Sequence, residues 1–289
     1  DNGATAGDEA FSPFKIAESY SGNPGSNAAP SPTASMEGVA GNQMSIQILK
    51  QTVEAKSRKL SARWTFEAAQ DSQAMHGIDV EAEIMAALAQ EITAEIDQEV
   101  LASLNSLAGG AIETYDQNAV SGTATFVGDE HAALAVLINK NANTIAARTR
   151  RGAGNWAVVS PVALTILQSA STSAFARTTE GTFEAPTNTK FVGTLNNAMR
   201  VYVDTYAADN AMALVGYKGS SESDAPAFYC PYIPLMSSGV VMDPGTFEPV
   251  VSFMTRYGYV ELSNTASSLG NAADYLANVA ITSANVSFS

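Results

Sequence analysis

The feature that most constrains this chain is an apolar stripe that recurs every four residues between positions 78 and 107. Its members are Ile84, Leu88, Ile92, Ile96, Val100 and Leu104, with Met85, Leu101 and Leu107 at its edges. This period predicts one apolar face of a long amphipathic helix. Asp79 precedes the stripe, where an acidic side chain suits the positive end of the helix dipole, and Gly109 and Gly110 follow it as a stop signal. At about 1.5 Å per residue the helix is about 40 Å long, so the rest of the fold has to cover one long apolar face.

The other face of this helix is acidic. Its carboxylates are Glu91, Glu95, Asp97 and Glu99. No Lys or Arg occurs between Arg63 and Lys140, so the sequence predicts an acidic surface without local cations. A soluble hydrolase that uses Glu91 and Glu95 as a carboxylate pair is one interpretation, although such pairs on a helix surface are usually a solvated face.

The most basic stretch of the chain lies just before this helix. Its cations are Lys50, Lys56, Arg58, Lys59 and Arg63. Loose alternation of apolar and polar residues from position 46 predicts an extended, two-sided ribbon that projects from the body of the protein. We hypothesise that this ribbon lies across the acidic helix of an adjacent subunit, so that these five cations and Glu91, Glu95 and Glu99 belong to a subunit interface. Exposed ion pairs contribute only about 0–1 kcal/mol each, so their role would be register more than affinity.

Residues 1 to about 45 are rich in Gly, Ser, Asn, Ala and Pro. Such a segment buries too little apolar surface to offset the cost of ordering its backbone. Phe11, Phe14, Ile16 and Tyr20 interrupt it. Two interpretations stay open, a disordered tail or an arm that becomes ordered only against neighbouring subunits.

The remainder of the chain mixes helices and strands. Residues 129–150 predict a second helix, Trp156 to Val159 a short buried strand, and Ser160-Pro161 the start of a third helix. Further strands are predicted at FVGTL, MRVYVDTY, MALVGYKG, VVSFMTRYGYVEL and NVAITSANVSF, with a Pro-punctuated loop at APAFYCPYIPLM. The absence of a βαβ rhythm predicts the α+β class.

Three arginines in or just past the last turn of the second helix, Arg148, Arg150 and Arg151, have two interpretations. They are cations that suit the negative end of a helix dipole, or they form a cluster at a subunit interface.

Composition excludes several classes of function. The net charge of −14 argues against tight nucleic-acid binding, which needs clustered Lys and Arg, and no apolar run is long enough to span a membrane. Cys230 is the only cysteine, is expected to be a small buried residue, and leaves no disulfide or thiolate metal site. His76 and His131 lack metal-ligand spacing, and Gly216 to Ser220 predicts a turn, not a phosphate loop. We therefore expect no cofactor, no metal and no enzyme, although a hydrolase and a secreted adhesin remain as alternatives.

Several ordered motifs resemble one known family. SRKLSARWTFEAAQDSQAMHGIDVEAEIMAALAQEITAEIDQEV, which begins at Ser57, resembles the segment leading into the spine helix of major capsid proteins of T-even-type tailed bacteriophages. TRRGAGNWAVVSP is similar to their helix-to-strand junction, and GYKGSSESDAPAFYCPYIPL followed by FEPVVSFMTRYG is similar to their closing pattern.

This resemblance implies the Hong Kong 97-type (HK97-type) capsid fold. The expected parts are an N-terminal arm and start of the extended E-loop at 1–45, the basic ribbon of the E-loop at 46–72, a P-domain with the spine helix at 73–128, an A-domain at 129–248, and return strands of the P-domain at 249–289. The chain is too short for the additional insertion domain of the T-even type.

The function implied by the resemblance is that of a structural head protein. It would self-assemble into hexamers and pentamers of an icosahedral virion shell that encloses double-stranded DNA without sequence-specific binding. Assembly would occur in the host bacterial cytoplasm, with removal of an N-terminal segment and with decoration, vertex, portal and scaffold proteins as partners. The alternative of the same fold is an encapsulin-like nanocompartment.

Overall fold

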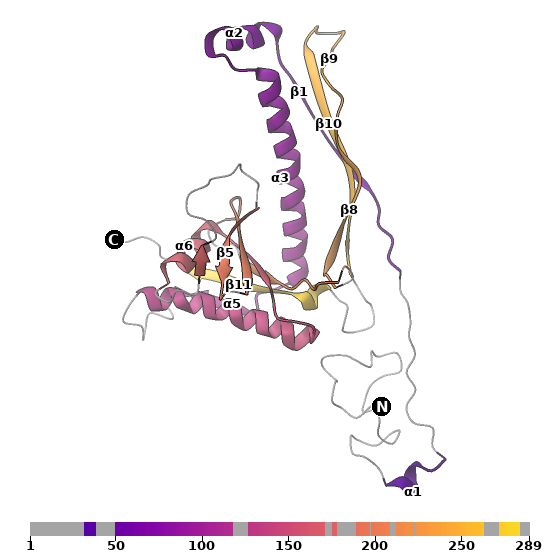
Figure 1. Cartoon of the computed structure of the whole chain (residues 1–289), viewed down its shortest axis with the longest axis vertical. Coiled ribbons are helices and arrows are strands. Elements are labelled where there is room, and N and C mark those ends of the chain that lie inside the picture. The colour runs from indigo at the N-terminus through magenta and orange to yellow at the C-terminus, as the bar shows by residue number, and fades with distance from the viewer. Residues whose placement is uncertain are drawn as a thin grey trace.

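The structure is a computed structural model that describes residues 32–38, 50–117, 127–170, 175–177, 189–196, 198–208, 212–221, 224–262 and 272–283. Most of the expected N-terminal arm therefore lies outside the described residues. Figure 1 shows two parts, a long upright stalk built around α3 and a flatter body that contains α5. The stalk comprises α2, α3 and a four-stranded sheet, and the body comprises a seven-stranded sheet with α5, α6 and the short helix η1. A short helix, α1 (Thr33–Met36), buries none of its residues.

The long helix predicted from the apolar stripe is confirmed as α3 (Val80–Ala108). Asp79 caps its start, because one side-chain oxygen accepts hydrogen bonds from the backbone N–H of Glu81 at 3.1 Å and of Ala82 at 3.4 Å. Its end is at Gly109, whose φ of 71° is in the range that glycine tolerates best. A shorter helix, α2 (Phe66–His76), precedes it at the far end of the stalk (Figure 1).

The sheet of the stalk runs in the order β1-β10-β8, with β9 also paired to β10. Its strands are β1 (Lys56–Arg63), β8 (Ala227–Ser237), β9 (Val241–Met242) and β10 (Pro249–Glu261). Ala62 lies opposite Val251 and Leu60 opposite Phe253, and these side chains pack with Ile92 of α3. Within the predicted basic ribbon, β1 is thus an edge strand of the stalk (Figure 1), and it packs against its own chain because alternate residues supply it with an apolar face.

The expected loop at APAFYCPYIPLM forms β8 instead. Pro231 and Pro234 misled the sequence prediction, since proline cannot donate to a strand ladder. In the structure β8 is an edge strand, where a missing N–H on the open side costs nothing.

The body contains a mixed sheet in the order β2-β11-β7-β3-β6-β5-β4. Its strands are β2 (Glu113–Asp116), β3 (Trp156–Val159), β4 (Phe175–Arg177), β5 (Thr189–Leu195), β6 (Met199–Asp204), β7 (Ala213–Gly216) and β11 (Leu276–Ser283). The pairs β2–β11 and β3–β6 are parallel and the other pairs are antiparallel. The helices are α5 (Val127–Thr149), α6 (Pro161–Ser169) and η1 (Ala272–Tyr275). Helices and mainly antiparallel strands confirm the α+β class predicted from the sequence.

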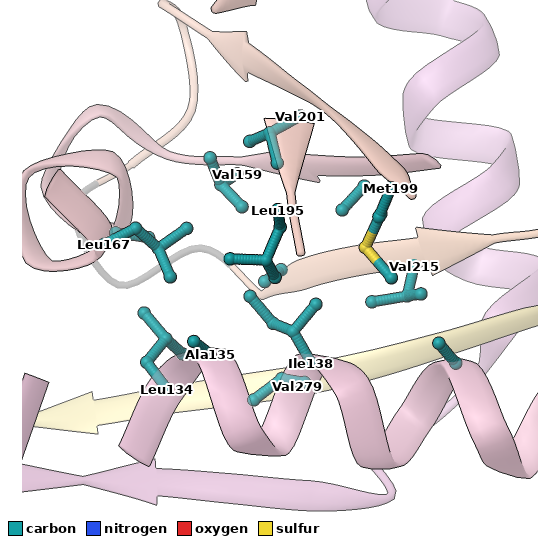
Figure 2. Close-up of a cluster of buried hydrophobic side chains, with 14 of the residues drawn as sticks. Leu134, Ala135, Ile138, Val159, Leu167, Leu195, Met199, Val201, Val215 and Val279 are labelled. Carbon is teal, nitrogen blue, oxygen red and sulfur yellow. The ribbon is translucent and has the colours of Figure 1, made fainter. Parts of the chain in front are cut away.

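The core of the body lies between α5, α6 and the sheet. Figure 2 shows Leu134 and Ile138 of α5 pointing toward Leu195 and Val279 of the sheet. Leu134, Ile138 and Leu195 are at most 1% exposed. Such close burial of branched side chains is the main stabilising term of a domain of this size.

The two sheets group the strands differently from the expected ranges. β8 and β9, expected within 129–248, lie in the sheet of the stalk, and β11, expected with the return strands at 249–289, lies in the body. The thirteen residues of β10 offer pairing edges to β1 on one side and to β8 and β9 on the other. Strand partners are set by such pairing and not by distance along the chain.

Polar contacts join the stalk to the body. The Asn278 side-chain amide of β11 donates to the backbone carbonyls of Asn105 at 3.3 Å and Gly109 at 3.1 Å, at the end of α3. Further up the helix, the Gln98 side-chain amide donates to Asp204 Oδ1 at 2.8 Å. The hydrogen bonds from Asn278 satisfy carbonyls that the helix end leaves open. Together with the contact between Gln98 and Asp204, they define how α3 stands on the body.

Candidate assembly surfaces

Arg58 is the centre of a charged cluster on the stalk. Its guanidinium lies 2.6 Å from Glu95 Oε2 and also contacts Glu99 Oε2. Tyr257 of β10 accepts a hydrogen bond from Arg58 Nε at 2.7 Å, and its own hydroxyl donates to Glu99. The ladder between β1 and β10 positions Arg58 over two carboxylates that are one turn apart on α3.

This cluster corrects the expectation of an unneutralised acidic helix. The hypothesis placed the partners of Glu95 and Glu99 in an adjacent subunit, whereas the structure places Arg58 of the same chain between them. The hydrogen bond from Arg58, followed by that from Tyr257, lowers the pKa of the Glu99 carboxyl, and the same carboxylate raises the pKa of Arg58. Sequence reasoning identified the residues and their charges correctly but could not tell which chain holds the partner.

The other predicted interface residues of the stalk lie at its surface. Exposed along the basic stretch are Lys50, Lys56 and Lys59. Arg63 Nη1 lies 3.8 Å from Glu248 Oε2 of the same chain, with more than half of its side chain exposed. Glu91 is exposed on α3. Their contact with another subunit stays a prediction.

Arg151 belongs to a second cluster, at the end of α5 in the body. Its Nη1 lies 2.9 Å from Asp224 Oδ1, and the Tyr275 hydroxyl donates to the same oxygen at 3.1 Å. The Tyr217 hydroxyl donates to Asp224 Oδ2 at 3.3 Å, so three side chains hold the loop that leads into β8. The hydrogen bond to Asp224 raises the pKa of Arg151. Arg150, beside it, has a φ of 50°, and its proposed role between subunits stays a prediction.

The hairpin that β8 and β9 form with β10 carries exposed apolar side chains that sequence reasoning missed. Its exposed side chains are Tyr229, Tyr232, Leu235, Met236, Val240, Val241, Met242 and Phe247. Tyr232 is 70% exposed and Phe247 is 75% exposed, with a φ of 60° that is uncommon for a bulky residue. Cys230, expected in the core, is also exposed, because it lies on this edge strand. The density of large apolar residues in AFYCPYIPLM was the available signal.

A groove of about 580 Å³ separates α3 from β8. Its walls are mainly apolar, with Ile92, Ile96 and Val100 on α3 and Tyr229, Ile233 and Leu235 on β8. Asp97 also lines it, and burial raises the pKa of this carboxyl. The groove therefore holds one acidic group inside an otherwise apolar surface.

The structure offers little for catalysis. In the described ranges, no three His, Cys, Asp or Glu side chains come close enough together to hold a metal ion. His131 is buried, with Nδ1 against the Ser169 hydroxyl at 2.5 Å, and burial lowers its pKa. His76 is exposed at the end of α2. Among the helices described here, none combines the length and the apolar character needed to cross a membrane.

Comparison with solved structures defines the class of fold. A chain of the mature capsid of bacteriophage PhiM1 is similar, with a TM-score of 0.50 and 13% identity over 86% of this chain and 79% of that one. A chain from Mycobacterium phage Adephagia also has a TM-score of 0.50, with 12% identity over 80% of this chain and 73% of that one. At these identities the likeness concerns the fold, which is that of the HK97-like phage capsid chains.

Comparison of sequences defines the family. Residues 3–286 match the family described as Major capsid protein Gp23. The major capsid protein of Vibrio phage KVP40 is 36% identical over 82% of this chain and 50% of its own length, and that of Enterobacteria phage T4 is 38% identical over 75% and 44%. The chain belongs to the Gp23 major capsid protein family, which confirms the resemblance seen in the sequence. It spans about half the length of these two relatives.

Proposed function

We propose that this chain is a structural subunit of a tailed-phage head, where many copies form a closed shell. The observation that carries the proposal is the set of exposed apolar side chains on the hairpin that β8 and β9 form with β10, in a member of the Gp23 family. Large apolar patches on a soluble protein are typical of protein–protein interfaces. Tyr232 and Phe247 are the kind of aromatic side chains that supply binding energy when a partner covers them.

Hexamers and pentamers of an icosahedral shell are the arrangement that we propose for these copies. The net charge of −14 supports a container that encloses double-stranded DNA without gripping it, because phosphate contacts need clustered cations. Portal, vertex, scaffold and decoration proteins complete the proposed set of partners. The virion is the proposed location, after assembly in the bacterial cytoplasm.

The exposed charges of the stalk supply the proposed register between copies. Arg58 already forms a hydrogen bond with Glu95 of its own chain. The charges available for contact with another copy are Lys56 and Lys59 of β1 and Glu91 of α3, all of which are exposed. Contacts between such groups weaken as salt rises, because the screening length falls from about 10 Å at 0.1 M to about 3 Å at 1 M. We therefore expect assembly to slow as ionic strength increases. Assembly that is equally fast and complete at low and high salt would contradict this part of the proposal.

Replacement of the two most exposed aromatic residues of the hairpin tests the role of its surface. We expect Y232S/F247S to fold normally, because both side chains are mostly exposed in the subunit, but to assemble poorly. The matched control, Y232F/F247Y, keeps the aromatic area and should assemble like the unaltered chain. Sedimentation of the assembled fraction and circular dichroism of the subunit are the two readouts. Normal assembly of a folded Y232S/F247S variant would contradict a role for this surface.

A further inference from the structure

The groove between α3 and β8 is a binding surface that the subunit leaves open. Its volume of about 580 Å³ falls in the range of about 300–1,000 Å³ that is usual for ligand sites. Tyr229 is 47% exposed and Leu235 is 39% exposed, both along the wall that β8 contributes. Covering such side chains is favourable by about 25 cal/mol per Å² of apolar surface removed from water. An apolar occupant is therefore expected.

Asp97 adds a requirement for a cation. The carboxylate is partly buried on α3, and burial raises its pKa. Within the part of the chain that the structure describes, no Lys or Arg forms an ion pair with it. A partly desolvated carboxylate is costly unless a cation or a hydrogen-bond donor reaches it. The occupant that fits has one positive charge among apolar side chains.

The edge of β8 limits how that occupant binds. Pro231 and Pro234 line the groove and have no backbone N–H to offer to an added strand. Strand addition depends on a row of main-chain hydrogen bonds, and proline is poorly suited to such a ladder because it cannot donate one. Side chains that enter the groove must supply the binding energy.

One segment of the chain has this chemistry. Residues 11–20, FSPFKIAESY, place Phe11, Phe14 and Ile16 around Lys15. Lys15 is the only Lys or Arg before Lys50, so this segment alone in the first 49 residues offers a cation within an apolar cluster. We propose that residues 11–20 of a second copy occupy the groove, with Lys15 against Asp97.

The position of α1 favours a second copy over the same chain. Figure 1 places α1 (Thr33–Met36) far from α3 and β8, beyond the base of the stalk. The roughly 12 residues between Tyr20 and Pro32 span at most about 40 Å when extended, so the position of α1 limits where residues 11–20 of the same chain can lie. The inference rests on the proposed shell, because it needs copies held side by side.

Zero-length crosslinking of assembled shells tests the contact. A carbodiimide joins a lysine amine to a carboxylate only where the two touch, and digestion after glutamate residues leaves Lys15 within residues 10–18 and Asp97 within residues 96–99. Shells assembled from an equal mixture of ¹⁴N- and ¹⁵N-labelled chains report which copies are joined. We expect the Lys15–Asp97 product, with about half of it carrying one label from each chain.

Matched variants separate Asp97 from its neighbours. D97N should abolish the product, whereas E91Q, which changes an exposed carboxylate of the same helix outside the groove, should leave it unchanged. K15D/D97K should restore a crosslink with the two roles exchanged. Shells without a Lys15–Asp97 product overturn this inference and leave the proposed function intact. If both peptides of every product carry the same isotope label, the contact lies within one chain and the choice of a second copy is overturned. Failure to form shells overturns the proposed function and this inference with it.

Discussion

In the body, α5 presents Leu134, Ile138 and Ile145 to a sheet that leaves none of them exposed, whereas in the stalk α3 buries only Ile92 of its long stripe. The difference comes from what covers each helix. The body encloses its core between α5, α6 and the sheet, while the sheet of the stalk covers part of α3 and leaves the groove beside β8 open. The body thus encloses its core within one chain, whereas the stalk leaves part of the apolar face of α3 open in the single chain.

The largest expected effect is in the core of the body. We expect Ile138→Ala to lower the free energy of unfolding by about 2–5 kcal/mol, because it removes a fully buried side chain from a closed core. Val136→Ala on the same helix is the control, since Val136 is 65% exposed and should cost less than about 0.5 kcal/mol. Denaturant unfolding of the unassembled chain measures both. Equal losses for the two variants would contradict the account of the body.

The same truncation in the stalk should cost less. Ile92 is only 2% exposed but also lines the groove, where water and neighbouring side chains can adjust around a smaller residue. We expect Ile92→Ala to lower the free energy of unfolding by about 2 kcal/mol, at the lower end of the range for such changes. Hydrogen exchange should show the loss of protection in α3 and not in α5. A loss as large as that of Ile138→Ala would mean that the stalk is packed as tightly as the body.

The charged cluster of the stalk should contribute a smaller coupling. Arg58→Met, Glu99→Gln and the double variant form a cycle for which we expect about 0.5–1 kcal/mol near neutral pH, because both side chains are about a third exposed. Since the pKa of Glu99 is lowered from 4.5, this stability is fully present above about pH 4.5 and is lost as the pH falls through the lower, folded-state pKa.

Arg63 and Glu248 supply the control cycle. Their charged atoms are 3.8 Å apart and the Arg63 side chain is 61% exposed, so the coupling should be only about 0.2 kcal/mol. Unfolding measured from pH 7 to pH 3 checks both cycles. A coupling for Arg58 and Glu99 that does not change across this range would contradict an ion pair with a lowered carboxyl pKa.

His131 should make the stability of the body depend on pH. Burial lowers the pKa of His131 from 6.5, and the adjacent Glu130 opposes part of this shift. As the pH falls, the unfolded chain therefore binds a proton at His131 before the folded chain does. Stability should therefore fall as the pH drops below 6.5, by at most about 1.4 kcal/mol per pH unit. His131→Gln should remove that decline between pH 7 and pH 5.5, and His76→Gln, at an exposed position, should not. An unchanged pH profile in His131→Gln would assign the decline to other groups.

Local patterns predicted the helices better than the partners of the strands. The stripe from Ile84 to Leu104 predicted α3, because helix periodicity is a property of neighbouring residues. The strand β8 was predicted as a loop because it contains Pro231 and Pro234, which cannot donate a backbone hydrogen bond. Proline is tolerated in an edge strand, but the sequence does not show which strands lie at the edge of a sheet.

At the candidate surfaces, too, the sequence predicted the charges of the residues better than the contacts between them. Charges on β1 and α3 predicted that the two segments attract each other, but only the ladder between β1 and β10 shows that Arg58 meets Glu99 within one chain. The groove joins residues of α3, β6, β8 and β10, so no local pattern contains it. Asp97 was one of four acidic residues assigned to the acidic face of α3 in the sequence, and its partial burial in the groove distinguishes it.

Imaging of the assembled chain by cryo-electron microscopy tests the central claim most directly. The account predicts closed, thin-walled icosahedral shells tens of nanometres across, with the exposed side chains of β8 and β9 covered by a neighbouring copy in the density. Only monomers or small closed oligomers, under conditions where circular dichroism shows a folded chain, would contradict it.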